Sequence, residues 1–246
     1  FVRGYEDHFK KPKGLSIASD LSLNLYYKMS PPLNNLKRLA CFTEIKCLEI
    51  LQNINKFQSL QKLELNDICI RNNERDPEKK FQLFGGLCQL IFLTELTVEL
   101  TFSMKRETFY FFEYIMLPSQ IIKLEFVLTN LSFSGLIGDL KEQNRASLEN
   151  FCKKLGTLKK LATLKFHFSI FDYFTLLHDL FEELSTDYPN LSKIDFLFRT
   201  DNEYIESVYL DKIFAWAAHI ESLRDISIRS TNLKILNLNI LNKSKN

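Results

Sequence analysis

The sequence predicts a single α/β solenoid, in which short parallel strands alternate with helices along the chain. Two observations lead to this prediction. A six-residue pattern, apolar-x-x-apolar-x-apolar, recurs along the chain, and the segments between its copies carry apolar residues at helical spacing. Internal similarity at a period of about 20 to 50 residues is typical of solenoids.

The recurring pattern is clearest in six copies. They are LQKLEL from Leu60, LTELTV from Leu93, IIKLEF from Ile121, LATLKF from Leu161, LSKIDF from Leu191 and LRDISI from Leu223. Successive copies begin 33, 28, 40, 30 and 32 residues apart. The spacing fits neither strict strand alternation nor a helical i, i+3, i+4, i+7 series over its full length. We therefore expect each copy to form one short strand of a common sheet.

Weaker copies and caps are expected towards the two ends. IKCLEI begins at Ile45, and the turn SPPLNN leads into LKRL, which places Leu36 and Leu39 in the pattern. Residues 1–35 include the segment LSIASDLSLNLYY, in which Leu21, Leu23 and Leu25 alternate, and this predicts one or two degenerate strands. Because a solenoid needs atypical terminal repeats to shield its open core, we interpret residues 1–35 as an N-terminal segment and cap. Residues 36–246 are the expected repeat domain.

The C-terminal end of the repeat domain allows two interpretations. LKILNL either starts a short final strand at Leu233 or completes the repeat that begins at Leu223. Only ten residues separate these two leucines. We favour a short, helix-free terminal turn that acts as the C-terminal cap.

Helical periodicity occupies the intervals between the copies. Apolar residues share one helix face in four segments, which are 81–91, 146–158, 172–190 and 204–220. In the first segment that face consists of Phe81, Phe84, Cys88 and Ile91, although two glycines weaken its helix propensity. Asp172 is suited to cap the start of the third segment. The expected order is therefore strand, helix, strand, helix.

Two polar segments fit neither pattern. CIRNNERDPEKK, from Cys69 to Lys80, is expected to form an exposed excursion. Residues from Gly135 to Asn144 fall in the 40-residue interval between copies. We expect an inserted loop there, because this interval is longer than the others.

The six-residue pattern resembles the start of the leucine-rich-repeat signature, L-x-x-L-x-L-x-x-N/C-x-L. The resemblance covers Ile45 to Leu233, and the helical returns are similar to those of the ribonuclease-inhibitor-like class. It implies a horseshoe with a parallel sheet on the concave side, a mostly helical convex side and a protein-binding role. The ninth position departs from the signature, with Ile68, Arg199 and mostly Thr or Ser elsewhere. Since Thr and Ser can supply part of the missing hydrogen bonding, we expect an irregular horseshoe.

In this register, the residues that flank each central apolar residue point out of the concave face and form rows across the strands. We predict that this face binds a partner. The candidate residues are Lys62, Glu64, Asn66, Glu95, Glu99, Lys123, Glu125, Val127, Lys165, His167, Lys193, Asp195 and Leu197. The Ile45 copy would add Cys47, Glu49 and Leu51 to the rows. In the competing interpretation the face is only solvated, because opposite charges on strands about 4.8 Å apart can pair with each other.

The apolar members of these rows favour a contact role. Leu51, Val127 and Leu197 would be exposed on a mostly polar face, and exposed apolar side chains gather at interaction surfaces.

The composition argues against several classes of protein. The net charge of +2 in 246 residues does not indicate a general polyanion binder. The cysteines form no Cys-x-x-Cys pair, which predicts reduced thiols, no metal site and an intracellular, cytoplasmic protein; they are Cys41, Cys47, Cys69, Cys88 and Cys152. No apolar run is long enough to span a membrane, so no membrane span is expected.

Motifs for catalysis or cofactor binding are absent from the sequence. The histidines His8, His167, His178 and His219 are scattered, and no phosphate-loop, dinucleotide or zinc-helix motif occurs. We expect no enzyme activity, catalytic residue, cofactor or metal site. The expected function is that of a non-catalytic interaction module, a scaffold or structural subunit of a larger assembly that binds one or more proteins.

An RNA- or DNA-associated subunit of a ribonucleoprotein is the alternative function. It rests on two basic clusters, His8–Gly14 and Lys153–Lys160, whose lysines are suited to contact phosphates. Lysines near a helix C-terminus are also favoured by the helix dipole alone, so the clusters do not require a nucleic acid.

Overall fold

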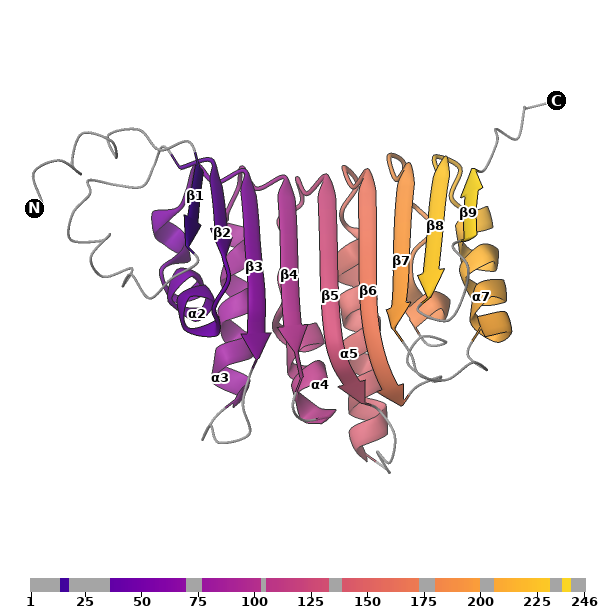
Figure 1. The fold of residues 1–246 in the computed structure, drawn as a ribbon, viewed down its shortest axis with the longest axis horizontal. Coiled ribbons are helices and arrows are strands. Elements are labelled where there is room, and N and C mark those ends of the chain that lie inside the picture. Colours follow the sequence, from indigo (N-terminus) through magenta and orange to yellow (C-terminus); the bar gives the residue numbers. More distant parts are fainter. Residues whose placement is uncertain are drawn as a thin grey trace, which may run out of the picture.

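The structure, a computed structural model, describes residues 14–17, 36–69, 77–102, 105–132, 139–172, 180–199, 206–230 and 236–239. Within them lies one nine-stranded sheet, whose strands follow the order of the chain from β1 to β9. Strands β1 to β8 are parallel, and β9 is antiparallel to β8. Figure 1 shows the strands side by side with the helices behind them. The fold is therefore α/β, with a parallel sheet in a solenoid-like arrangement.

The strands are β1 (Gly14–Ile17), β2 (Arg38–Cys41), β3 (Lys62–Cys69), β4 (Glu95–Thr101), β5 (Lys123–Ser132), β6 (Thr163–Asp172), β7 (Lys193–Arg199), β8 (Asp225–Ser230) and β9 (Leu236–Asn239). The helices are α2 (Glu44–Gln52), α3 (Pro77–Gln82), α4 (Lys105–Tyr114), α5 (Asp139–Gly156) and α7 (Glu206–Ala218), with 3-10 helices η1 (Ile54–Lys56) and η2 (Leu83–Gln89). Residues 180–183 are also helical. The six clear copies of the pattern are confirmed as β3 to β8, each strand beginning two residues after the first apolar residue.

The three apolar residues of each copy form the core of the sheet. In all six copies they are at most 3% exposed. Parallel pairing in register places equivalent residues beside each other. The sixth residues of the copies in β5, β6 and β7 therefore form a row of aromatic rings. The ring centroids of Phe126 and Phe166 are 5.7 Å apart, and those of Phe166 and Phe196 are 6.0 Å apart. The repeat in the sequence thus becomes one continuous ladder of core contacts.

The prediction of a strand from Ile45 is wrong, because residues 44–52 form helix α2. Cys47, Ile50, Leu51 and Ile54 are all buried, and their spacing is the i, i+3, i+4, i+7 series of a helix face. The strand of this repeat is β2, which belongs to the copy that begins at Leu36 and pairs in register with β3.

Segment 81–91 is helical as expected, but its buried face differs from the expected one. Helix α3 passes into the 3-10 helix η2 after Gln82. A 3-10 helix has about three residues per turn, which brings Phe81, Phe84 and Leu87 to the core. Cys88, which we expected on that face, is exposed for the same reason, and Ile91 is exposed in the turn that follows η2.

The two polar segments are more helical than expected. The prediction of an inserted loop is wrong from Asp139 onwards. The 18-residue helix α5 starts there and fills the longest interval between copies. The prediction of an exposed excursion is wrong from Pro77 onwards, because helix α3 begins there. This helix contacts α2, since Lys80 Nζ lies 2.9 Å from Glu44 Oε1. Residues 70–76 and 133–138 lie outside the described residues.

The other expected helices agree with the structure where it describes them. Helices α5 and α7 confirm segments 146–158 and 204–220, with Leu148, Phe151, Cys152, Leu155, Ile213 and Trp216 buried. In segment 172–190, Asp172 is the last residue of β6, and residues 180–183 are helical. The start of that helix lies outside the described residues.

The two ends of the sheet carry strands. Strand β1 confirms one strand at the start of LSIASDLSLNLYY, and the rest of this segment, from Ala18 onwards, lies outside the described residues. At the other end, β9 forms a final strand from Leu236, and its direction is reversed relative to β8. A short antiparallel strand therefore closes the C-terminal end of the sheet, and the prediction of a terminal turn without a strand is wrong.

Threonines at the ninth position join neighbouring repeats, as the substitution of Asn by Thr predicts. The hydroxyl oxygens of Thr101 and Thr129 are 2.7 Å apart. Thr129 Oγ1 also donates to the carbonyl of Leu100 at 3.2 Å. In β3 the bulge shifts the register, so Cys69 pairs with Thr101, whereas Ile68 pairs with Leu100 and is fully buried.

Candidate functional site

One face of the sheet carries polar side chains and lies opposite the helices. On β3, Lys62, Glu64 and Asn66 are partly exposed, whereas Leu63 and Leu65 are fully buried. The same alternation recurs on the later strands, because successive strand residues point to opposite faces. We call the outward residues of β2 to β8 the open sheet face. It contains all the partner-binding residues that the sequence predicts on β3 to β8.

The strand register arranges the open sheet face into rows. From β4 to β8 the rows are Glu95, Lys123, Thr163, Lys193 and Asp225; Thr97, Glu125, Lys165, Asp195 and Ser227; and Glu99, Val127, His167, Leu197 and Arg229. Lys62 and Glu64 of β3 continue the first two rows. Asn66 leaves the third row, because Asn66 and Asp67 together stand opposite one β4 residue, and Asp67 has a φ of 56°.

The rows differ from the expected ones only at the first repeat. Cys47, Glu49 and Leu51 belong to α2 and are not part of the open sheet face. Their places are taken by Arg38 and Ala40 of β2, which pair with Lys62 and Glu64. The spacing LKRLAC in the sequence already contained this strand, since the first, fourth and sixth residues are all buried.

Most charged groups of the first row are neutralised by a neighbour. Lys123 Nζ lies 3.1 Å from Glu95 Oε1, and Lys193 Nζ lies 2.7 Å from Asp225 Oδ2 on the next strand. The hydrogen bond from Lys193 to Asp225 raises the lysine pKa. Lys62 pairs at 2.6 Å with Glu64 two residues along its own strand, and this bond raises the pKa of Lys62.

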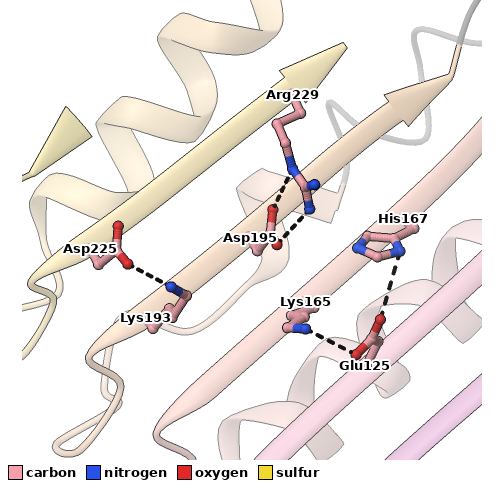
Figure 2. Close-up of polar contacts among 7 residues, drawn as sticks. All are labelled: Glu125, Lys165, His167, Lys193, Asp195, Asp225 and Arg229. Carbon is pink, nitrogen blue, oxygen red and sulfur yellow. Dashed lines mark hydrogen bonds and ion pairs between the residues drawn. The ribbon is translucent and has the colours of Figure 1, made fainter. Parts of the chain in front are cut away.

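Glu125 is the centre of the middle row. Its Oε2 lies 3.2 Å from Lys165 Nζ and its Oε1 lies 3.8 Å from His167 Nδ1, so one carboxylate faces two groups of β6, as Figure 2 shows. Burial lowers the pKa of His167, while Glu125 and Asp195 raise it and Arg229 and Lys165 lower it further. The neutral imidazole is therefore favoured beside the Glu125–Lys165 pair.

Asp195 and Arg229 form the most buried ion pair of the face. Arg229 donates from Nε to Asp195 Oδ1 at 3.3 Å and from its terminal nitrogen to Oδ2 at 2.7 Å (Figure 2). The Asp195 side chain is only 12% exposed, whereas that of Arg229 is 38% exposed. This two-point contact fixes the orientation of the guanidinium relative to the carboxylate.

The apolar members of the open sheet face are less accessible than expected. Leu51 is buried in α2, and Val127 and Leu197 are half-buried between polar neighbours of the same row. The face therefore presents mainly paired charges, and its apolar residues add a narrow strip along the third row.

All five cysteines carry thiols, and none forms a disulfide. Cys47 Sγ donates to the carbonyl of Asn66 at 3.5 Å, which ties α2 to β3. Burial and the neighbouring Cys41 raise the pKa of the Cys47 thiol well above its usual range, with the contact to Cys41 as the larger cause. Burial also raises the pKa of Cys152. Both thiols are thus protonated groups that pack in the core.

Two of the four lysines in the second basic cluster, Lys153–Lys160, make contacts within the fold. Lys154 Nζ donates to the carbonyl of Glu113 at 2.5 Å and to that of Phe112 at 3.5 Å, at the C-terminal end of α4. Burial lowers its pKa. Lys159 Nζ lies 2.7 Å from Asp187 Oδ2. Only Lys153 and Lys160 of this cluster are exposed without an ion pair among the described residues. The first cluster, residues 8–14, lies outside the described residues except for Gly14.

The described residues contain no group of three or more His, Cys, Asp or Glu side chains that could hold a metal ion. No helix in this part of the chain has the length and apolar character needed to cross a membrane. The fold thus defines an α/β protein with a solenoid-like parallel sheet and a polar open face. No model of a known protein family matches the chain, and no curated protein is significantly similar to it.

Proposed function

We propose that the chain is a non-catalytic, leucine-rich-repeat-like protein that binds a partner protein, as a scaffold or as a subunit of a larger assembly. The main support for this proposal is the open sheet face. Its polar side chains form rows across the parallel strands, and the helices leave this side of the sheet uncovered in Figure 1. A surface of this kind is long and shallow, which suits a protein partner better than a small molecule.

The electrostatics of the open sheet face support binding over chemistry. Five ion pairs engage ten of its charged groups, namely Lys62–Glu64, Glu95–Lys123, Glu125–Lys165, Lys193–Asp225 and Asp195–Arg229. Side chains held by one another lose less conformational entropy when a partner arrives. The resulting pattern of fixed positive and negative positions provides specificity by complementarity.

The same proposal places the protein inside the cell. It is supported by the five cysteines outside disulfides, of which Cys41, Cys47 and Cys152 are buried.

Native purification tests the proposed function. The protein is isolated from its own cells under mild conditions, half of the sample is treated with nuclease, and both halves are sized and analysed by mass spectrometry. We expect a fixed set of associated proteins that nuclease does not alter. A monomer in both halves contradicts a stable subunit, and dissociation by nuclease supports the ribonucleoprotein alternative.

Charge-swap variants then test the open sheet face. The double variant Glu125→Lys/Lys165→Glu keeps the net charge and retains an ion pair of the opposite orientation, so the fold is expected to survive. A partner that recognises the charge pattern should nevertheless bind less tightly, since two like-charge contacts replace favourable ones. The matched control is the swap Lys212→Glu/Glu182→Lys on the helical side, whose native pair is 2.6 Å long. Equal affinity of both variants would remove the open sheet face from the proposal.

The nucleic-acid alternative receives less support from the geometry. Lys154 and Lys159 are engaged with backbone carbonyls and with Asp187, so half of the expected phosphate contacts at the second cluster are already occupied. The exposed members, Lys153 and Lys160, remain for that role.

A further inference from the structure

A second surface, at the edge where the strands begin, has apolar side chains in solvent. Five large apolar residues of the described chain are exposed, and four of them lie in the segments that enter β4 and β5: Ile91 (60%), Phe92 (55%), Met116 (43%) and Ile122 (38%). We call these four the amino-edge patch. Exposed apolar residues are ordinary when scattered, but their concentration at one place marks an interaction site.

Backbone and side-chain contacts bring the two segments of the amino-edge patch together. The amide of Ile122 donates to the carbonyl of Thr94 at 2.8 Å, and the Gln120 side chain donates to the carbonyl of Leu90 at 3.2 Å. The amide of Met116 donates to the carbonyl of Phe84 at 3.4 Å. The entry to β5 is therefore fixed directly beside the entry to β4.

The chain itself provides the comparison that makes the patch unusual. Each of the strands β3 to β8 is preceded by a two-residue turn at the same position of the repeat. In order, these turns are Gln58-Ser59, Ile91-Phe92, Ser119-Gln120, Lys159-Lys160, Pro189-Asn190 and Glu221-Ser222. Only the turn before β4 consists of two large apolar residues.

In three of the other turns the second residue makes side-chain hydrogen bonds that Phe92 cannot make. Asn190 donates to the carbonyl of Lys159 at 2.7 Å, and Ser222 donates to those of Tyr188 and Leu191. Gln120 makes the equivalent contact to Leu90. Phenylalanine has no donor, and Phe92 is more than half exposed, so its presence is not explained by packing or hydrogen bonding of the repeat.

Charges around the amino-edge patch indicate the chemistry of its partner. On one side of the patch, Lys37 lies just before β2 and Arg38 is its first residue; on the other side, Lys160 lies before β6. All three side chains are exposed, and none has an ion pair among the described residues. The acids of this part of the edge, Glu95 and Asp187, are each paired with a lysine. The apolar patch is therefore flanked by uncompensated positive charge.

We infer that the amino-edge patch docks a segment of a partner protein that has large apolar side chains flanked by acidic residues. Apolar side chains of the segment cover Phe92 and its neighbours, and its acids face Lys160 and Arg38. A protein segment fits better than a nucleic acid, because three of the four patch residues are not aromatic and cannot stack on bases. The inference rests on the proposed protein-binding function but does not depend on the open sheet face.

Selection from a phage-displayed library of random peptides, with the full chain as bait, tests the inference. We expect enriched peptides to combine two or more large apolar residues with Asp or Glu. A synthetic copy of an enriched peptide should lose affinity about tenfold or more with Phe92→Ser, because a central aromatic residue is a typical hot spot. Lys160→Glu should weaken binding and reduce its salt dependence.

The matched control is Phe42→Ser. Phe42 is 41% exposed but follows the carboxyl end of β2, at the opposite edge of the sheet, so its replacement should leave the affinity unchanged. Circular dichroism of each variant verifies the fold. No enrichment, enrichment of basic peptides, or equal loss with Phe42→Ser would overturn the inference.

Two further outcomes separate this inference from the proposed function. Peptide binding that is lost with Glu125→Lys/Lys165→Glu but kept with Phe92→Ser would overturn the amino-edge patch and support the open sheet face. Displacement of the peptide by a random single-stranded RNA pool, with RNA binding lost in Phe92→Ser, would assign the patch to nucleic acid and overturn the inference. The native assembly tests the proposed function independently of either result.

Discussion

Replacement of Phe166 tests whether the stacked core holds the repeats together. Phe166 is 1% exposed, and its ring lies 5.7 Å from that of Phe126, 5.3 Å from Phe168 and 6.0 Å from Phe196. Phe166→Ala removes a buried ring from the middle of this row and leaves a cavity, which costs about 3–5 kcal/mol. Since whole domains are stable by roughly 5–15 kcal/mol, this is a large share of the total.

Urea denaturation followed by circular dichroism measures the effect of Phe166→Ala. Phe92→Ala is the matched control: the same side chain is removed from a 55% exposed site, and we expect a change below about 1 kcal/mol. The double variant with Phe196→Ala should show a coupling of about 0.5–1.5 kcal/mol, because these rings stack directly. The reasoning is refuted if Phe166→Ala is no more destabilising than the control.

Three more predictions concern single contacts. Lys154→Met removes the side-chain donor to the last carbonyls of α4 and should destabilise the protein by about 1–2 kcal/mol, with faster hydrogen exchange at the end of α4. Gly86→Ala should destabilise by about 1–3 kcal/mol in urea denaturation, since its Cβ would lie 2.9 Å from Ile54 Cγ2, whereas Gly85→Ala meets nothing closer than 3.5 Å and should be tolerated. Because burial lowers the pKa of His167, the folded state binds fewer protons than the unfolded chain, so stability should fall as the pH decreases below the ordinary histidine value of about 6.5; His167→Gln should flatten this part of the stability–pH curve.

The strands of the sheet could be derived from the sequence because the pattern that specifies each strand lies within six consecutive residues. Apolar residues at the first, fourth and sixth positions of six copies recur with the same internal spacing, and all of them are buried. Once equivalent residues pair in register, the outward rows follow without further information. The predicted open-face residues from Lys62 to Leu197 therefore lie where the sequence places them, apart from Asn66 at the bulge.

The first repeat could not be derived in the same way because its sequence satisfies two patterns. IKCLEI fits the strand pattern, but Cys47, Ile50, Leu51 and Ile54 also form a helix face. The decision depends on competition for the place beside β3, which β2 occupies through the pairs Arg38–Lys62 and Leu39–Leu63. Local spacing contains no information about that competition.

The sequence by itself determined the α/β class, the positions of strands β3 to β8 and the order of charges on those strands, because the strand period and the repeat length are properties of the chain alone. The tertiary structure decided which charges pair: Glu125 with Lys165, and Asp195 with Arg229. It also decided that Cys88 and Ile91 are exposed, since the 3-10 pitch of η2 turns Cys88 away from the core and Ile91 lies in the turn after η2. Both outcomes depend on side-chain distances and helix pitch, which are set only when neighbouring repeats pack together.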